Sequence, residues 1–250
     1  METKILFGPS RDAWDGFGPL LIDLIERNKL KNICDIGGGA NPVLDADFIS
    51  RNGIEYHLLD ISERELSKAP ENYNKILADI ASPYFKLDIK FDLVFSKMLA
   101  EHISDAEQFH KNVLSCLAEN GLAVHFFPTL YTLPFFANYI FPERIVSILL
   151  NKLAPRDRYQ HEKFPAYYRW CRGPTLKQMQ RFTTLGYDIV EYRGYFGHSS
   201  YYKKIPLLKK IHNIKTNYLL RHPNPSFTSY VYVVLKKAKV GDPAEAHISS

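Results

Sequence analysis

The chain has 250 residues, of which 46% are hydrophobic and 24% charged, and its formal net charge at pH 7 is +5. This composition is typical of a globular protein and excludes intrinsic disorder, collagen and coiled coil. Three cysteines at irregular spacing, Cys34, Cys116 and Cys171, exclude a disulfide scaffold and indicate free thiols in a reducing compartment. The zinc patterns CxxC and HExxH are absent, so we expect no metal site.

Five short apolar runs alternate with helical patterns in the first half of the chain. The runs cover residues 32–37, 55–60, 75–80, 91–96 and 122–127, and the helical patterns cover 12–28, 43–51 and 105–119. Near-continuous apolar runs of this length are typical of strands that are covered on both faces. The alternation predicts an α/β fold with a doubly wound, parallel sheet.

The alternation changes after the fifth strand. A Pro- and aromatic-rich insertion spans about 129–174, and a helix at 175–186 and a strand at 187–192 follow it. A second, basic insertion at 197–226 precedes a last strand at 227–235. We therefore expect one domain over 1–238 with seven strands and with insertions after strands 5 and 6 that form a substrate cap. The small, polar residues 239–250 indicate a disordered tail.

A glycine-rich turn follows the first buried strand. Asp35-Ile36-Gly37-Gly38-Gly39-Ala40-Asn41 would let the backbone approach a ligand, and the helix behind it would offer free N–H groups. One interpretation is a dinucleotide site, because Asp60 ends the next strand, where an acid can bind a ribose. Against it, Asp35 would repel a pyrophosphate and attract a cationic amino-acid group, and Pro42 interrupts the GxGxxG pattern.

Four segments, taken in chain order, resemble the motifs of class I S-adenosylmethionine-dependent methyltransferases. Residues 32–41 resemble motif I, an acid followed by GxG, with Asn41 where the family commonly has a third glycine. Leu59-Asp60-Ile61 resembles the ribose motif, and Ala78-Asp79-Ile80 resembles the adenine motif. Residues 91–103 resemble the strand-four motif and the active-site loop after it. With the late strands, the resemblance extends to about residue 237.

This resemblance implies a fold, a cofactor and a set of cofactor contacts. The fold is a doubly wound, seven-stranded, mostly parallel sheet with one antiparallel strand, and the cofactor is S-adenosylmethionine. The methionine part would be contacted by Asp35, Gly37, Gly38, Gly39 and Asn41, and the ribose by Asp60 and Ile61. The adenine would be contacted by Asp79 and Ile80, and the sulfonium end by Ser96 and Lys97. Alternatively, Asp79 only caps a following helix and Gly38 only fits a tight turn.

The loop after the fourth strand narrows the choice of methyl-acceptor class. Residues 96–102 lack the (Asn/Asp)-Pro-Pro-(Tyr/Phe) pattern of enzymes that methylate base amines, and no cysteine lies near for carbon-5 pyrimidine chemistry. The additional carboxylates of metal-dependent enzymes are also missing. Metal-free O-methylation is favoured, with N-methylation second. His102 is the candidate general base, because an ordinary histidine pKa of about 6.5 suits a proton acceptor near neutral pH. Alternatively, His102 only shapes the pocket.

Positive charge is concentrated late in the chain. Residues 151–240 hold 18 Lys and Arg against 4 Asp and Glu, a net of +14, whereas the remainder carries −9. The same segment holds 16 of the 34 aromatic residues, and aromatic faces stack on rings while Arg binds phosphate. This favours an anionic, ring-bearing acceptor, such as a small, lipid-linked or nucleotide-linked sugar, although a merely solvated basic face is the alternative. Candidate acceptor contacts are His125, Tyr131, His161, Tyr168, Arg169 and Arg172. Alternatively, His125 is a core histidine.

Two other functions and a location follow from the same features. The basic, aromatic segment could follow the phosphates of an RNA acceptor, which makes an RNA methyltransferase the second hypothesis. A non-catalytic binding protein on the same fold is the third. The first residues lack the apolar core of a signal peptide, so we expect a cytoplasmic protein. The apolar stretch 130–153 is interrupted by Pro134 and Pro142 and could contact a membrane surface peripherally.

Overall fold

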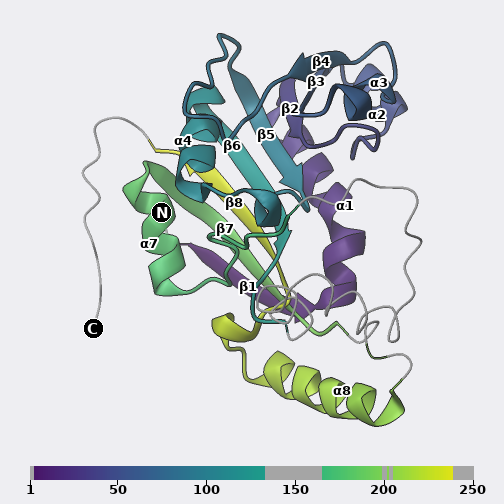
Figure 1. Cartoon of the computed structure of the whole chain (residues 1–250), viewed down its shortest axis with the longest axis vertical. Helices are drawn as coiled ribbons and strands as arrows, with labels where there is room; N and C mark the ends of the chain where they lie inside the picture. Colours follow the sequence, from purple (N-terminus) through teal and green to yellow (C-terminus); the bar gives the residue numbers. More distant parts are fainter. Residues whose placement is uncertain (1–2, 133–164, 199–201, 203–204, 239–250) are drawn as a thin grey trace.

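The computed structural model describes residues 3–132, 165–198, 202 and 205–238 (Figure 1). The strands are β1 (Lys4–Pro9), β2 (Asn32–Ile36), β3 (Glu55–Asp60), β4 (Asn74–Leu77), β5 (Phe91–Lys97), β6 (Leu117–Pro128), β7 (Tyr187–Phe196) and β8 (Tyr230–Lys237). The helices are α1 (Ser10–Asn28), α2 (Ala46–Arg51), α3 (Glu63–Ser67), α4 (Ala106–Cys116), α7 (Leu176–Thr184) and α8 (Pro206–Arg221), with short 3₁₀ turns η1 (Ala100–His102) and η3 (Pro225–Phe227).

One sheet contains all eight strands, in the order β1-β7-β8-β6-β5-β2-β3-β4. Strand β8 pairs antiparallel with β6 and β7, and the other pairs are parallel. The predicted fold class, a doubly wound and mostly parallel α/β sheet with one antiparallel strand, is confirmed. The order reverses between β2 and β5, and in such sheets ligands bind beyond the carboxyl ends of the strands at this point.

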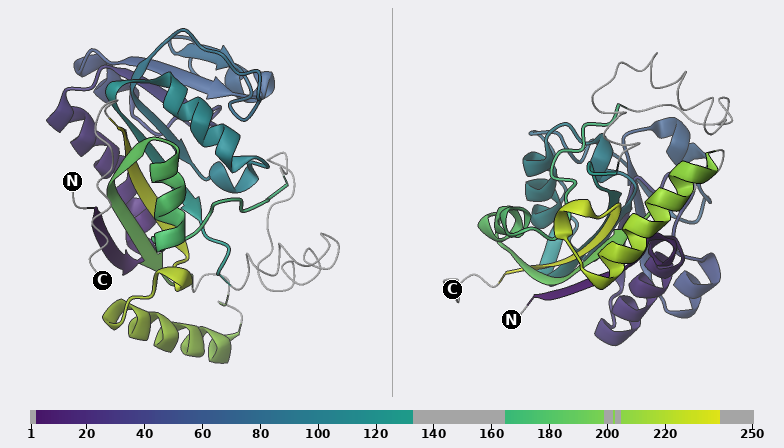
Figure 2. Two further views of the ribbon diagram at one scale, coloured as in Figure 1. Left: turned by 90° about the vertical axis from the view of Figure 1, so that its left-hand side faces the viewer. Right: turned by 90° about the horizontal axis from the view of Figure 1, so that it is seen from below.

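The two faces of the sheet carry separate hydrophobic cores. Helices α1, α2 and α3 pack on one face, where the buried ring of Phe17 lies among Phe95, Phe126 and Tyr232. Helices α4 and α7 pack on the other face, which buries Phe109 among others. Figure 2 shows these layers from two further sides. Burial on both faces explains why the central strands are near-continuous apolar runs.

Side-chain caps fix where the predicted helices begin. Asp45, Asp105 and Thr175 each accept backbone N–H bonds at the start of α2, α4 and α7. Helix α2 therefore begins at Ala46, later than the predicted residue 43. The expected extent of α4 to residue 119 is wrong, because the helix ends at Cys116 and the chain enters β6 at Leu117.

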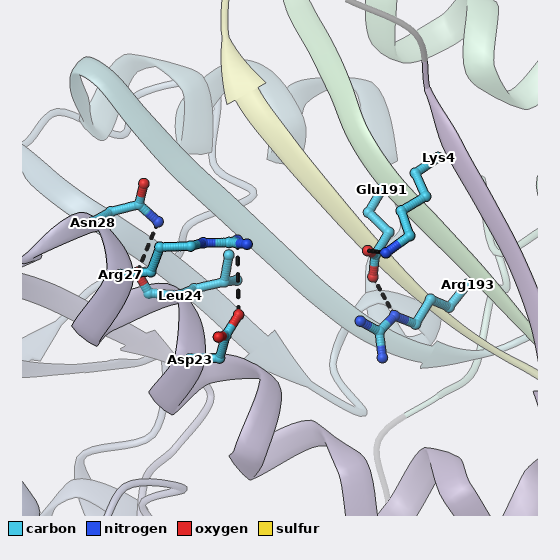
Figure 3. A network of polar contacts seen from close by, with 7 residues as sticks. All are labelled: Lys4, Asp23, Leu24, Arg27, Asn28, Glu191 and Arg193. Atoms are coloured by element: carbon cyan, nitrogen blue, oxygen red, sulfur yellow. Dashed lines mark hydrogen bonds and ion pairs between the residues drawn. The ribbon is translucent and has the colours of Figure 1, made fainter.

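The sheet has one strand more than the seven predicted. The additional strand, β1, pairs with β7 at the edge of the sheet, and Phe7 stacks on Phe196 with 5.4 Å between ring centroids. Glu191 on β7 lies between Lys4, at 3.4 Å, and Arg193 (Figure 3). Strand β1 is only partly buried, because an edge strand is covered on fewer sides, and its apolar run is short, Ile5 to Phe7.

The second expected insertion contains a long helix. Helix α8 lies outside the layers, below the end of the sheet at which β7 ends in Figure 1. Residues 133–164 of the first insertion and the tail 239–250 lie outside the described residues, so their expected roles stay predictions. The three cysteines are buried and free. In the part of the chain that is described, no helix is long and apolar enough to cross a membrane.

Candidate active site

The carboxyl ends of β2, β3 and β4 form one edge, and backbone bonds hold their ends in line. The N–H of Gly37 donates to the carbonyl of Leu59 at 2.8 Å, and the N–H of Ala78 donates to that of Asp60 at 3.0 Å. The glycine turn, the ribose motif and the adenine motif therefore lie side by side at the switch point. The sequence motifs predicted this juxtaposition.

Asp35 lies under the glycine turn with 1% of its surface exposed. Its Oδ2 accepts hydrogen bonds from the hydroxyl of Tyr56 at 2.7 Å and from the N–H of Val43 at 3.2 Å. Burial raises the pKa of Asp35 to about 7, even though both hydrogen bonds and the charge of Lys97 lower it. A cationic ligand group beside this carboxyl would favour its ionised form.

The glycines leave no room for side chains between the turn and two carboxylates. A Cβ on Gly38 would lie 2.5 Å from Oδ2 of Asp35, and one on Gly39 would lie 2.9 Å from Oδ2 of Asp60. Gly37 and Gly39 also have positive φ angles, 75° and 33°. The N–H of Asn41 closes the turn on the carbonyl of Gly38 at 2.7 Å. This acidic backbone cradle fits a ligand with an ammonium group and a ribose, as S-adenosylmethionine has.

Asp60 ends β3 and is half-buried. Its Oδ1 accepts the N–H of Ser62 at 2.9 Å, and burial is the chief cause of its raised pKa. The neighbouring Ile61 exposes 60% of its surface, so an apolar side chain adjoins the expected ribose contact. Asp79 is exposed, and its Oδ1 accepts the N–H of Ala81 at 2.9 Å, which caps a turn and not a helix. Ile80 is buried in the core.

The side chains of Ser96 and Lys97, at the end of β5, lie on opposite faces of the sheet. Ser96 is fully buried, and its hydroxyl lies 2.8 Å from Nδ1 of His125 in β6, which is also fully buried. Burial lowers the pKa of His125 to about 3, so this ring is neutral. Both side chains thus lie in the core, and the ligand contacts expected of them stay predictions. Lys97 lies on the other face, where it lowers the pKa of Asp35 and its Nζ is 5.7 Å from the ring centroid of Trp14.

His102 lies in the loop after β5, in the turn η1. Its Nδ1 is 2.8 Å from the carbonyl oxygen of Pro165, which can only accept, so Nδ1 carries the proton of the neutral ring. The ring lone pair is then on Nε2, as a proton acceptor requires. The His102 side chain is 33% exposed.

Glu101 is a residue that sequence reasoning missed. It is buried beside His102, with its Oε1 3.9 Å from Nε2, and burial raises its pKa to about 8. Its backbone carbonyl accepts the N–H groups of Tyr167 and Tyr168, at 2.7 and 3.0 Å. The active-site loop is thereby joined to the chain that follows the first insertion. An acid at 101 carries no sequence signal of burial, because acids are ordinarily exposed.

The candidate acceptor residues are only partly brought together. The guanidinium of Arg172 lies 5.2 Å from the ring centroid of the exposed Tyr131, and its Nη1 donates to the carbonyl of Tyr168 at 2.9 Å. Tyr168 is buried and Arg169 is exposed. His161 lies outside the described residues.

The sheet order, the acidic glycine cradle and the aspartate at the end of β3 together define a class I S-adenosylmethionine-dependent methyltransferase. A family model described as a methyltransferase domain matches residues 18–203, and the chain belongs to this family. It is a methyltransferase enzyme, and its cofactor is S-adenosylmethionine. No curated protein matches the chain.

Several solved structures share this fold. An S-adenosylmethionine-dependent methyltransferase from Clostridium acetobutylicum is 13% identical, with a TM-score of 0.54 over 89% of this chain and 91% of that one. The N-methyltransferase NodS from Bradyrhizobium japonicum, in complex with S-adenosyl-L-homocysteine, is 11% identical, with a TM-score of 0.52 over 91% and 88%. An S-adenosylmethionine-dependent methyltransferase from Archaeoglobus fulgidus is 16% identical, with a TM-score of 0.52 over 90% and 97%. At these identities the likeness concerns the fold alone.

Proposed function

We propose that the enzyme methylates a hydroxyl group of an anionic, ring-bearing acceptor and that His102 removes the hydroxyl proton. The observation that carries this proposal is the contact of Nδ1 of His102 with the carbonyl of Pro165 at 2.8 Å. It sets the ring lone pair on Nε2, in a partly exposed side chain at the carboxyl end of β5. A hydroxyl is a weak nucleophile at neutral pH, and a positioned base contributes typically 10²- to 10⁴-fold to such a reaction.

The cofactor half of the site supplies binding and orientation. S-adenosylmethionine, when bound, supplies a methyl group from a positively charged sulfur. Asp35 would hold the ammonium group, Asp60 the ribose and Asp79, at the neighbouring strand end, the adenine. The glycine turn lets the backbone come close, and a Cβ at Gly38 would collide with Asp35. These residues raise the rate by fixing the cofactor against the acceptor.

The acceptor half has the opposite charge. Residues 151–240 carry a net charge of +14, and Arg172 with Tyr131 combines a guanidinium with an exposed ring. A guanidinium binds phosphate through paired hydrogen bonds, and an aromatic face stacks on a sugar ring or a base. A lipid-linked or nucleotide-linked sugar has both features, so we assign this class to the acceptor.

Transfer of radiolabelled methyl groups tests this assignment. Extracts of cells that lack the gene contain the unmethylated acceptor, and they would be incubated with the purified enzyme and S-adenosylmethionine labelled in the methyl group. We expect label in glycolipid or sugar-nucleotide fractions, in an oxygen-linked methyl group by mass spectrometry. Label found only in RNA, or only on nitrogen, would refute the acceptor class or the reaction type, respectively.

A further inference from the structure

Helix α8 packs one side against the part of the protein that the structure describes and exposes a second, apolar side. Leu219 is buried, and Leu208, His212 and Thr216 on the same side are half-buried. The second side exposes Leu207 by 70%, Ile211 by 54%, Ile214 by 62% and Tyr218 by 63%. Spacings of four, three and four residues align these four side chains, which we call the outer stripe, along one face. An aligned apolar stripe on a helix surface indicates a binding face.

Positive charges border the outer stripe. At about 100° per residue, Lys210 and Arg221 lie along one side of it and Lys215 along the other. No Asp or Glu occurs between residues 192 and 240, so nothing in this part of the sequence neutralises them. Phe227 adds a further exposed ring beside Lys215, whose Nζ lies 5.3 Å from the ring centroid. The helix therefore combines an apolar stripe with a basic border.

The position of α8 is fixed at its inner face. The N–H of His198, just after β7, donates to Nε2 of His212 at 2.7 Å. Gly197 has a φ of 93°, and a Cβ there would lie 2.9 Å from the side chain of Thr216. Figures 1 and 2 show the helix lying along one end of the molecule with its length outside the sheet layers. These contacts fix the orientation of α8 and therefore the orientation of its outer stripe.

We propose that the outer stripe of α8 binds the surface of an anionic lipid membrane. Helices that lie in a membrane interface insert an apolar face at the boundary between headgroups and acyl chains, while Lys and Arg contact the lipid phosphates. A second copy of this chain fits less well, because two basic borders would then face each other. RNA also fits less well, because three of the four stripe residues are aliphatic and offer no ring for bases to stack on.

Flotation with lipid vesicles tests the proposal on the full chain. Phosphatidylcholine vesicles with and without about one third phosphatidylglycerol are the probes, at low and high salt. We expect binding to the anionic vesicles, at least tenfold weaker binding to the neutral ones, and loss of binding at high salt. Absence of binding to anionic vesicles at low salt would overturn the proposal.

Matched variants distinguish vesicle binding through the outer stripe from nonspecific binding by the rest of the protein. Ile211→Ser with Ile214→Ser is expected to weaken vesicle binding at least tenfold, while Asn213→Ser with Asn217→Ser, on the adjoining polar side, leaves it unchanged. Affinity for S-adenosylmethionine and the melting temperature of both variants should match wild type, which shows that they are folded. Equal vesicle binding by the two variants would overturn the assignment to this stripe. A third result would also overturn it: wild type does not bind vesicles, and the stripe variant has a different oligomeric mass from wild type in light scattering. A second copy of the chain would then be the occupant of the stripe.

Discussion

The hydroxyl of Tyr56 donates a 2.7 Å hydrogen bond to Oδ2 of Asp35, beneath the glycine turn. The two residues lie on neighbouring strands, β3 and β2, and both side chains are buried. The bond favours the ionised carboxyl against burial, which acts in the opposite direction. Tyr56 therefore supports the negative charge of Asp35, on which we expect cofactor binding to depend.

Removal of this hydroxyl should weaken cofactor binding. In Tyr56→Phe the pKa of Asp35 is expected to rise further, and a net hydrogen bond of about 0.5–1.5 kcal/mol corresponds to a roughly 2- to 12-fold loss of affinity at pH 7. Titration calorimetry with S-adenosylmethionine measures it. Tyr73→Phe is the control, because that ring packs on Tyr56 with 5.2 Å between centroids. Equal affinity in wild type and Tyr56→Phe would show that the bond does not support the site.

Cofactor affinity should depend on pH through Asp35. With a pKa of about 7 in the ligand-free protein, Asp35 gains its proton as the pH falls below 7 and no longer attracts the ammonium group. The dissociation constant should therefore rise between pH 7 and pH 5, by at most about tenfold per unit. Asp35→Asn should bind weakly and without this dependence. A wild-type affinity that is constant between pH 5 and pH 8 would contradict the raised pKa.

One glycine substitution should weaken cofactor binding, and another should stabilise the protein. In Gly38→Ala the new Cβ would meet the carboxylate of Asp35 at 2.5 Å, which forces the carboxylate from its position and should weaken cofactor binding more than tenfold. In Gly18→Ala the Cβ meets nothing within 4 Å, inside helix α1, and should stabilise the protein by roughly 0.5–1 kcal/mol. Calorimetry and thermal melting measure the two effects. Equal cofactor affinity of the two variants would contradict the close packing at Gly38.

Loss of the His102 ring should affect turnover more than binding. His102→Ala is expected to bind S-adenosylmethionine like wild type and to lose roughly 10²- to 10⁴-fold in the rate constant of methyl transfer. His222→Ala is the matched control, since His222 is exposed at the end of α8, where it packs on Tyr218. Rates would be followed with the labelled acceptor fraction. Near-normal turnover in His102→Ala would leave this residue a role in pocket shape only.

The sequence predicted the central part of the fold because its strands are buried on both faces and alternate with helical patterns. Strand β1 was missed because it lies at an edge and its residues pair with residues of β7 that are 187 positions away in the sequence. Helix α8 was missed because its basic, apolar composition was interpreted as an insertion. The spacing of Leu207, Ile211, Ile214 and Tyr218 was the signal that indicated a helix.

Only those residues of the candidate site that belong to a sequence motif could be predicted from the sequence. The glycine turn, Asp35 and Asp60 follow strand ends, so the motifs predicted their common edge. The contact of Tyr56 with Asp35 and the burial of Glu101 depend on three-dimensional packing, and no sequence pattern indicates either of them. Ser96 and His125 lie in the core because the central strands are covered on both faces, and His125 packs against Phe109 and His110 of α4.

The central claim, that this sheet edge binds S-adenosylmethionine through acidic strand ends, is tested most directly by calorimetry on Asp60→Ala. Asp92→Ala is the control, because Asp92 accepts the N–H groups of Lys31 and Asn32 at the start of β2, the opposite end from Asp60. We expect wild type and Asp92→Ala to bind S-adenosylmethionine alike and Asp60→Ala to bind at least 100-fold more weakly, with an unchanged circular dichroism spectrum. No binding by wild type, or equal binding by Asp60→Ala, would contradict the claim.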